Sequence, residues 1–174
     1  METGNTGAGI FFTNTFERGE WQAWNLGSNM EVFDAELFAI KQAMQLASKR
    51  VSFQTEDIWI FSDSQAAIKR IAKSRVGAGQ AYVKGIQELA ESIDANINIH
   101  VHWVPGHMNI YGNDQADKAA KRGTKIQSSS SEAVTSLSYL KKKIKKESLV
   151  KWKRKWANAR NRGRFYSKLE CDLR

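Results

Sequence analysis

Short runs of hydrophobic residues near the start of the chain predict a β-hairpin. Residues 9–13, Gly-Ile-Phe-Phe-Thr, are rich in residue types that favour strands. Residues 21–26, Trp-Gln-Ala-Trp-Asn-Leu, alternate with a period of two, which also favours a strand. Gly19 separates the two runs, and two such runs joined by a turn are typical of a hairpin.

Helices and strands interleave in the residues that follow. Hydrophobic side chains recur every three or four positions over residues 32–49, which predicts a helix with Asn29 as a candidate N-cap. Residues 58–62, Ile-Trp-Ile-Phe-Ser, form a continuous run that is typical of a strand buried on both faces. This order of elements indicates an α/β fold, a mixed sheet flanked by helices. The remaining predicted elements are helices over 64–74, 80–94 and 113–122 and a strand over 97–104.

The chain divides into three predicted regions. Residues 1–127 contain the elements named so far. Residues 128–136 begin with four serines, which is typical of a linker. Residues 137–174 form a basic tail, and a hydrophobic stripe at approximately helical spacing predicts that it is helical. The stripe consists of Leu137, Leu140, Ile144, Leu149, Trp152 and Trp156.

Positive charge is concentrated in this tail. The 174 residues include 27 Lys and Arg and 18 Asp and Glu, a net charge of +9. Residues 137–174 hold 14 of the basic and 3 of the acidic residues, so they carry +11 and residues 1–136 carry −2. Such a tail favours a polyanionic partner, and we expect nucleic acid, although a solvated helix that only aids solubility has the same composition. The expected contacts are Lys141, Lys142, Lys143, Lys145 and Lys146.

Composition excludes several classes of protein. Cys171 is the single cysteine, which excludes a disulfide framework and zinc sites built from several cysteines. No hydrophobic run approaches the ~18 residues that a membrane span needs. The first residues lack the basic and apolar regions of a secretory signal. We therefore expect an intracellular protein with no membrane partner, in the nucleus or in the cytoplasm.

Several acidic residues stand where the pattern predicts buried or strand-end positions. Glu36 falls within the hydrophobic stripe of helix 32–49, where an unpaired carboxylate is costly, so it either reaches the helix edge, pairs with a buried cation or belongs to a site. Asp63 follows strand 58–62, and ligand sites of open α/β sheets gather at such ends. Capping the next helix is the alternative role of Asp63.

A second group of candidates opens the helix at 113–122. Asp114 and Asp117 are three residues apart and share a helix face, although acids in a first turn are also favoured by the helix dipole. His107 closes the preceding strand and stands just before them. Acids on a helix, at a strand end and on a late helix are together a set of oxygen ligands suited to Mg²⁺. Two such ions about 4 Å apart stabilise both oxygens of a phosphodiester displacement.

Four stretches together resemble the type 1 ribonuclease H family, over about residues 4–127. Residues 35–40, Ala-Glu-Leu-Phe-Ala-Ile, look like the family's helix motif with a metal-binding Glu, and 60–67 look like the strand motif with a metal-binding Asp. Residues 103–107 and 112–120 look like the late His loop and the helix with the last Asp. Their order and spacing match as well. The resemblance is of the kind seen in the ribonuclease H domains of non-LTR retrotransposon polyproteins, where a similar Trp- and Lys-rich tail follows.

This resemblance implies an activity and a role for each candidate. Glu36, Asp63 and Asp117 would be ligands of two Mg²⁺ ions. His107 would assist proton transfer or product release, and Asp114 matches an acidic position near the site. The implied reaction is endonucleolytic hydrolysis of the RNA strand of an RNA–DNA hybrid. The implied protein partner is the rest of a retrotransposon polyprotein.

The chain departs from the family pattern at its start. The family begins with a central strand that carries its first catalytic Asp within Asp-Gly-Ser, and Met1 stands in what resembles the turn after that strand. We therefore expect the strand and its Asp to be absent here, and hybrid cleavage to be impaired. The strands on either side of the vacant position are expected to leave a void or to pair directly.

Two classes of function remain open from the sequence. The first is a Mg²⁺-dependent hybrid ribonuclease. The second is an inactive ribonuclease H-like fragment that binds nucleic acid through its basic tail. An integrase-like nuclease on the same fold is a weaker third reading, because the His107 loop followed by Asp114 and Asp117 matches ribonuclease H better.

Overall fold

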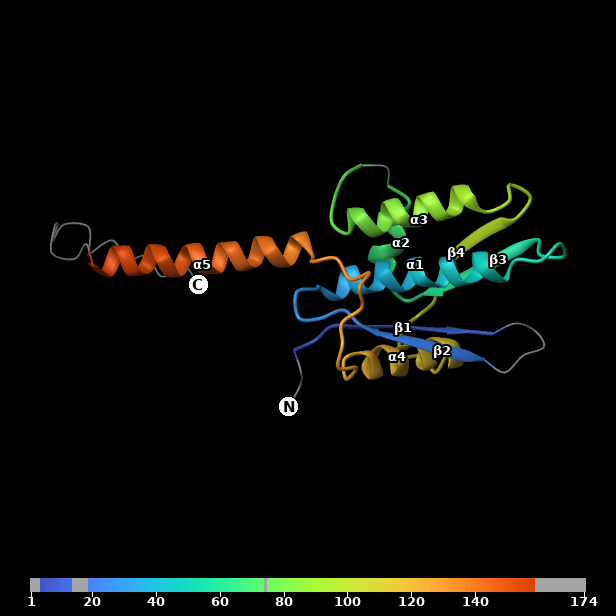
Figure 1. Cartoon of the computed structure of the whole chain (residues 1–174), viewed down its shortest axis with the longest axis horizontal. Coiled ribbons are helices and arrows are strands. Elements are labelled where there is room, and N and C mark those ends of the chain that lie inside the picture. Colours follow the sequence, from blue (N-terminus) through green and yellow to red (C-terminus); the bar gives the residue numbers. More distant parts are fainter. Residues whose placement is uncertain (1–3, 14–18, 74, 159–174) are drawn as a thin grey trace. The chain divides into compact units, whose positions relative to one another are not determined.

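The computed structural model describes residues 4–13, 19–73 and 75–158 (Figure 1). They form two compact units, residues 1–137 and residues 138–174, which are treated separately below. The first unit contains four strands and four helices in the order β1-β2-α1-β3-α2-α3-β4-α4, and the second contains α5. The α/β fold expected from the sequence is confirmed.

The strands form two small sheets instead of the single mixed sheet that the sequence predicts. β1 (Gly7–Phe12) pairs antiparallel with β2 (Glu20–Asn25), with Gly7 opposite Asn25. β3 (Asp57–Ser62) pairs parallel with β4 (Asn98–Trp103), with Asp57 opposite Asn98. Among the described residues, no strand joins the two pairs. The direct pairing of β1 with β3 considered above therefore does not occur.

Helix α1 (Val32–Arg50) connects the two sheets through a common core. Its N-cap is Glu31, so the assignment of Asn29 as the cap is wrong. Leu37 and Phe38 on α1 are fully buried in one cluster with residues of β1 and of β3. The Phe38 ring makes edge-to-face contacts with Trp24 and Tyr82, at centroid distances of 5.6 and 5.8 Å. Such pairs add to the stabilisation from apolar burial.

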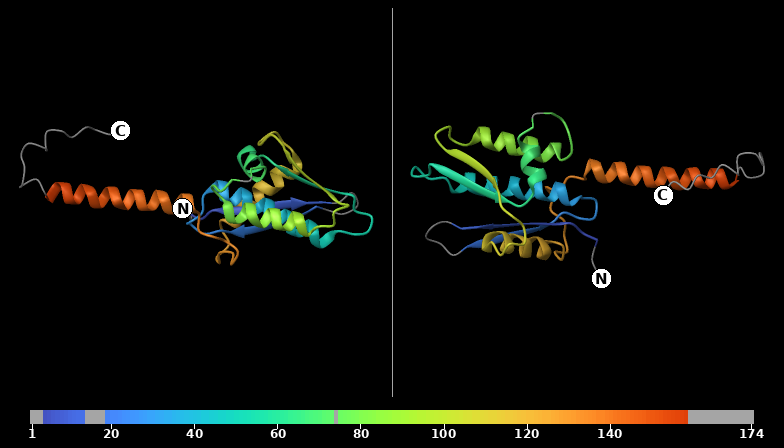
Figure 2. Two further views of the ribbon diagram at one scale, coloured as in Figure 1. Left: turned by 90° about the horizontal axis from the view of Figure 1, so that it is seen from above. Right: turned by 180° about the vertical axis from the view of Figure 1, so that it is seen from behind.

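Helix α4 (Tyr111–Gly123) packs closely on the hairpin. Two glycines of β1 permit this approach, because a Cβ atom on Gly7 or Gly9 would overlap the backbone at Ala120. Gly123 at the end of α4 is equally close to the backbone of Trp24. Figure 2 shows α4 and α1 on opposite sides of the hairpin. The glycine spacing in β1 therefore fixes where the late helix lies.

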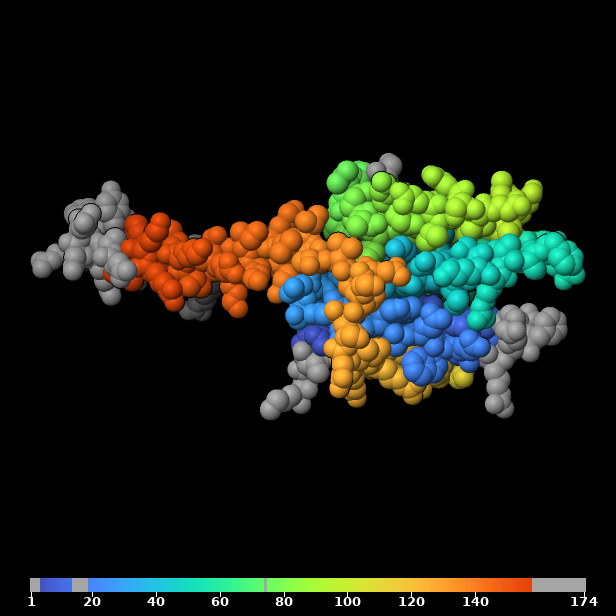
Figure 3. All heavy atoms as spheres, viewed as in Figure 1, coloured from blue at the N-terminus to red at the C-terminus, as the bar shows by residue number. Residues whose placement is uncertain are grey.

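Helices α2 (Gln65–Ile71) and α3 (Gln80–Ser92) complete the first unit. α3 packs along α1, and its residues form the green surface over α1 in the space-filling view (Figure 3). The buried Arg70 guanidinium holds the α2–α3 connection, because it donates to the carbonyls of Lys73 and Ala78 and to the side chain of Gln80. This connection lines the hollow described below.

Residues 128–136, expected from their serines to be a linker, form hydrogen bonds with other parts of the first unit. Ser130 N–H donates to the Asn25 carbonyl at 2.7 Å, and Val134 N–H donates to the Tyr82 hydroxyl at 2.9 Å. Glu132 accepts from Gln42 and pairs with Lys41 at 3.3 Å. The segment therefore lies along the surface of the domain as far as the end of this first unit.

The tail contains one long helix in its described part. α5 (Leu137–Asn158) extends the helix expected over 137–156, and the expectation for 159–174 lies outside the described residues. Trp152 and Trp156 stack on each other, with their ring centroids 5.4 Å apart. A search of the described residues for a helix of membrane-spanning length and hydropathy finds none.

Candidate active site

Glu36 lies half-buried on the face of α1 that meets the sheets. Burial is the main reason that its pKa rises from 4.5 to about 7, and repulsion from the carboxylates of Asp63 and Asp117 adds to the rise. A carboxylate that loses hydration near other negative charges holds its proton more tightly. These three acids, which are far apart in the sequence, are therefore brought together electrostatically.

Asp63 follows the last residue of β3 and is held by the loop after β4. Gly106 packs against its carboxylate, so that a Cβ atom there would come within 2.9 Å of Oδ2. Asn113 Nδ2 donates to Asp63 Oδ2 at 3.4 Å, and Trp103 Nε1 donates to the Asp63 carbonyl at 3.1 Å. Helix α2 is capped by Ser64, whose hydroxyl accepts from the Ala67 N–H. The alternative role of Asp63 as the helix cap is thus not the one observed.

The late loop and α4 supply the remaining candidates. His107 Nδ1 lies 3.8 Å from Asp117 Oδ2, and the His107 side chain is 86% exposed. His107 has a φ of 57°, in the left-handed region, which turns the chain sharply before α4. Asp114 lies in the first turn of the same helix. The structure therefore places His107 beside Asp117.

The acids match a hard divalent ion in type but not in spacing. Glu36, Asp63 and Asp117 all offer carboxylate oxygens, which are the ligands that Mg²⁺ prefers. Within the described part of the chain, however, no three His, Cys, Asp or Glu side chains lie close enough together to hold a metal ion. The residues present therefore supply metal-binding groups without forming a closed metal centre.

A hollow lined by basic residues lies beside α2 and was not predicted from the sequence. Its volume is about 470 Å³, and it opens beside α2 and the connection to α3. Phe33 of α1 and Ala66 of α2 line it. In the sequence, Phe33 stands three residues before Glu36, and Ala66 stands three residues after Asp63. The four basic residues within 69–75 were the available signal, but only folding shows that they converge. The basic lining residues are Lys69, Arg70, Lys73 and Arg75.

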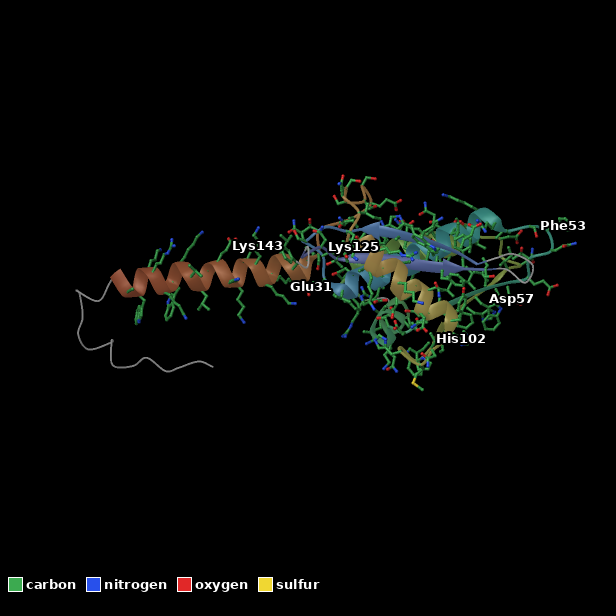
Figure 4. The ribbon with its side chains drawn as sticks, turned by 90° about the horizontal axis from the view of Figure 1, so that it is seen from below. Glu31, Phe53, Asp57, His102, Lys125 and Lys143 are labelled. Atoms are coloured by element: carbon green, nitrogen blue, oxygen red, sulfur yellow. The ribbon has the colours of Figure 1, made fainter. Side chains whose placement is uncertain are left out.

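The lysines expected to contact nucleic acid are exposed on α5. Lys143, labelled in Figure 4, extends from the helix into solvent. The hydrophobic side chains Ile144, Leu149 and Trp152 on the same helix are also half-exposed or more. Within its own unit, α5 therefore offers both positive charge and aromatic surface.

Two solved structures are similar to this chain, and the first of them supports the fold. RNase H1 from the halophilic archaeon Halobacterium salinarum NRC-1 matches with a TM-score of 0.55 and 18% identity, over 70% of this chain and 86% of that one. The N-terminal RNase H domain of rv2228c from Mycobacterium tuberculosis, solved as a fusion with maltose-binding protein, matches with a TM-score of 0.48 and 18% identity. That match covers 70% of this chain and 85% of the other.

The fold and the three coupled acids together define a ribonuclease H-like domain. The RNase H family model matches residues 1–125, which is more than half of the chain. This chain belongs to the RNase H family.

Proposed function

We propose that this chain hydrolyses the RNA strand of RNA–DNA hybrids. The observation that carries the proposal is the electrostatic coupling of Glu36, Asp63 and Asp117 in a chain of the RNase H family. The three acids come from α1, from the end of β3 and from α4, in the order that the motif resemblance implies. Mg²⁺ is the proposed cofactor, and when bound it would stabilise the charge on the oxygens of the displaced phosphodiester.

The chain's own residues hold the acids and expose a candidate proton carrier. Gly106 and Asn113 fix the orientation of the Asp63 carboxylate. His107 extends into solvent beside Asp117, where a substrate oxygen can reach it. Imidazole groups commonly move protons in catalysis. We therefore infer that His107 assists proton transfer or product release, and that Asp114 is an acidic residue near the site.

The positively charged hollow supports a nucleic-acid substrate. Phosphates bind Lys and Arg through charge-assisted hydrogen bonds. Phe33 and Ala66, in the first turns of α1 and α2, line the hollow, and we propose that it holds a phosphate of the same nucleic acid that is cleaved at Asp63. We expect Lys73→Gln to raise KM for a hybrid more than it lowers kcat. Lys84→Gln, at the exposed ion pair with Glu88, is the matched control that leaves KM unchanged.

A second candidate function is binding without cleavage. It is favoured by the open spacing of the acids, since no three candidate ligands among the described residues gather around one point. For the same reason we expect the 174-residue chain to cleave hybrids slowly. Retention of hybrids with no cleavage at any Mg²⁺ concentration would favour this second function.

The decisive experiment follows cleavage of a labelled RNA strand in a hybrid, with single-stranded RNA and duplex RNA as comparison substrates. We expect slow Mg²⁺-dependent cleavage of the hybrid alone, abolished by EDTA and by Asp63→Asn. Asp94→Asn, in the exposed loop before β4, is the control that retains activity. Equal cleavage by the Asp63→Asn protein would contradict the proposed site.

Two further parts of the proposal rest on the motif resemblance. We propose that the chain acts within a retrotransposon polyprotein and works inside the cell. Co-purification of this chain with a reverse transcriptase from the source cells tests the first, and cell fractionation tests the second.

A further inference from the structure

The sheet of β3 and β4 has one buried face and one exposed face. Ile58 and Ile60 of β3 are buried in the core around α1, and Ile99 and Val101 of β4 pack against that core. Because side chains alternate between the two faces along a strand, the intervening residues lie on the other face. The residues of this exposed face are Asp57, Trp59 and Phe61 from β3 and Asn98, His100 and His102 from β4.

The four ring side chains of this face form one cluster. Trp59 stands opposite His100 in the ladder, and their rings stack with centroids 4.1 Å apart and planes at 15°. Phe61 stands opposite His102, whose ring lies 5.2 Å from the Trp59 ring. The rings of Trp59 and Phe61 are nearly parallel, at 14°, with centroids 6.4 Å apart. The ladder therefore places two ring pairs side by side.

The rings of this cluster are open to solvent. Trp59 is 53% exposed and Phe61 is 60% exposed, and His102 is exposed as well. Asp57 and His102, which belong to the same face, are labelled in Figure 4. Exposed apolar side chains that gather in one patch mark an interaction surface more often than single ones do. The flat rings make this surface suited to another flat ring.

The charge and composition of the face favour nucleic-acid bases over a protein segment. Asp57 is the single acid among the six residues, and its Oδ1 lies 2.9 Å from His100 Nε2. The hydrogen bond from His100 is the main cause that lowers the pKa of Asp57. An imidazolium at His100 neutralises Asp57, and His102 adds a second imidazole, so phosphates are not repelled. None of the six side chains is aliphatic, as the apolar anchors of docked protein segments commonly are.

The face leads toward the candidate active site. Asp63 follows Phe61 by two residues, which continues the alternation just beyond the end of β3. Since a strand rises about 3.3 Å per residue, the Asp63 backbone lies roughly 7 Å beyond that of Phe61. Trp103 at the end of β4 donates its indole N–H to the Asp63 carbonyl, which ties the two strand ends together. A nucleic acid bound at Asp63 can therefore continue onto the face.

The spacing of the rings fits an unpaired strand. Successive nucleotides of one strand in a duplex are about 3.4 Å apart, and each base is covered by its neighbours. The centroids of Trp59 and Phe61 are separated by 6.4 Å, so neighbouring rings match neighbouring bases only where the bases are unstacked. Unstacked bases of single strands bind the rings of Phe, Tyr, Trp and His by stacking.

We propose that the exposed face of β3 and β4 binds two consecutive unpaired nucleotides, one base at Trp59 and His100 and the next at Phe61 and His102. The substrate is then a hybrid with a single-stranded extension beside the segment that is cleaved at Asp63. This inference rests on the proposed function for the place of cleavage. Binding of the extension is measured separately from cleavage.

The test compares a blunt RNA–DNA hybrid with the same hybrid carrying a short oligothymidine extension, placed at each strand end in turn. The full chain with Asp63→Asn is used, so that the hybrid stays intact during the binding measurement. Trp59→Leu with Phe61→Leu keeps the face apolar and removes its large rings. Trp21→Leu, at a ring of β2 that is 47% exposed, is the matched control.

We expect an extension to tighten binding at least about fivefold, and the double Leu variant alone to lose this gain. The salt dependence of the gain is expected to be small, because stacking on rings releases no counterions. Unchanged affinity of the double Leu variant for the blunt hybrid shows that its fold is intact. Trp59→Phe with Phe61→Tyr, which keeps two rings, is expected to retain the gain.

Photochemical cross-linking from the natural rings locates the extension directly. With 5-iodouracil in the extension we expect cross-links to Trp59 or Phe61, and none to this face with 5-iodouracil in the paired segment. Cross-links only to Trp152 or Trp156 would assign the extension to α5 and overturn the proposal. Equal affinity for blunt and extended hybrids, or an equal loss in the Trp21→Leu protein, would also overturn it.

Cleavage by the unmodified chain separates this inference from the proposed function. Tighter binding of the extended hybrid without cleavage would support the face and count against the nuclease. Cleavage together with equal affinity for blunt and extended hybrids would support the nuclease and overturn the face. A dimer in solution that the double Leu variant dissociates would assign the face to a second copy of the chain, and would overturn it too.

Discussion

Glu36 shows most clearly how surroundings set the behaviour of a single residue. A raised pKa means that the folded protein binds the proton more tightly than the unfolded chain does between pH 4.5 and about 7. Stability from this residue is therefore greatest at low pH and falls as the pH rises through that window. The loss is at most roughly 3 kcal/mol, and solvent screening at the half-buried site reduces it.

Glu36→Gln removes this charge and is expected to flatten the dependence of stability on pH. Urea unfolding of the metal-free protein at pH 5 and pH 8 measures it, with Glu91→Gln on exposed α3 as the control. We expect Glu36→Gln to be more stable than the natural protein at pH 8 and similar to it at pH 5. A variant that is less stable at pH 8 would show that the Glu36 carboxylate has a stabilising partner.

Two glycines provide opposite tests of local packing. Gly9→Ala is expected to destabilise the protein by roughly 1–3 kcal/mol, because its methyl group would overlap the α4 backbone at Ala120. Gly112→Ala meets only ordinary contact with Phe11 at 3.6 Å and lies within α4, so it is expected to stabilise by about 0.5–1 kcal/mol. Chemical unfolding measures both. Equal effects would mean that α4 does not approach β1 as described.

At the scale of elements, α5 has the features of a nucleic-acid-binding helix. Its lysines are exposed, and its Trp152 and Trp156 rings stack on each other without burial in its own unit. The two features predict different partners. Phosphates bind the positive charge of the lysines, whereas proteins or nucleic-acid bases bind the aromatic rings. Separate variants can therefore distinguish them.

Replacing Lys141, Lys142, Lys143, Lys145 and Lys146 with Gln is expected to weaken nucleic-acid binding and to reduce its salt dependence. For each phosphate that the variant no longer neutralises, the slope of log affinity against log salt becomes shallower by about 0.7–0.9. Trp152→Ala with Trp156→Ala is the matched variant that keeps the charge and the salt slope. To test the whole helix, the chain is truncated after Leu137, because Glu132 and Val134 form hydrogen bonds with Gln42 and Tyr82 within the first unit. An unchanged slope after truncation would assign α5 to protein contacts.

At the scale of the whole molecule, the first unit is held together by α1 more than by its sheets. In the described part of the chain each sheet has two strands, and a two-stranded sheet is marginal without further packing. We therefore expect a low melting temperature for the 174-residue chain, below about 65 °C. Scanning calorimetry measures it. A cooperative transition above that temperature would argue that the free edges of β1 and β3 cost little.

Much of the fold could be predicted from the chain because it depends on local patterns. The alternation in β1 and β2, the helical spacing of α1 and the run at 58–62 each occupy a few consecutive residues, and their periods follow from strand and helix geometry. The positions of Glu36 within a hydrophobic stripe and of Asp63 at the end of a strand follow from the same local patterns. Helix caps were less predictable, because Glu31 and Ser64 are fixed by the path of the entering chain.

Only the tertiary structure decided how these elements meet. The sequence could not show that the strands remain two separate pairs, because pairing depends on which edges are brought within hydrogen-bonding distance. Nor could it show that Lys69, Lys73 and Arg75 line one hollow, since they converge through the Arg70 contacts to the α2–α3 connection. The raised pKa of Glu36 likewise needs Asp63 and Asp117 nearby in space. Local periodicity determines the elements, whereas electrostatic coupling and free sheet edges arise from contacts between residues far apart in the chain.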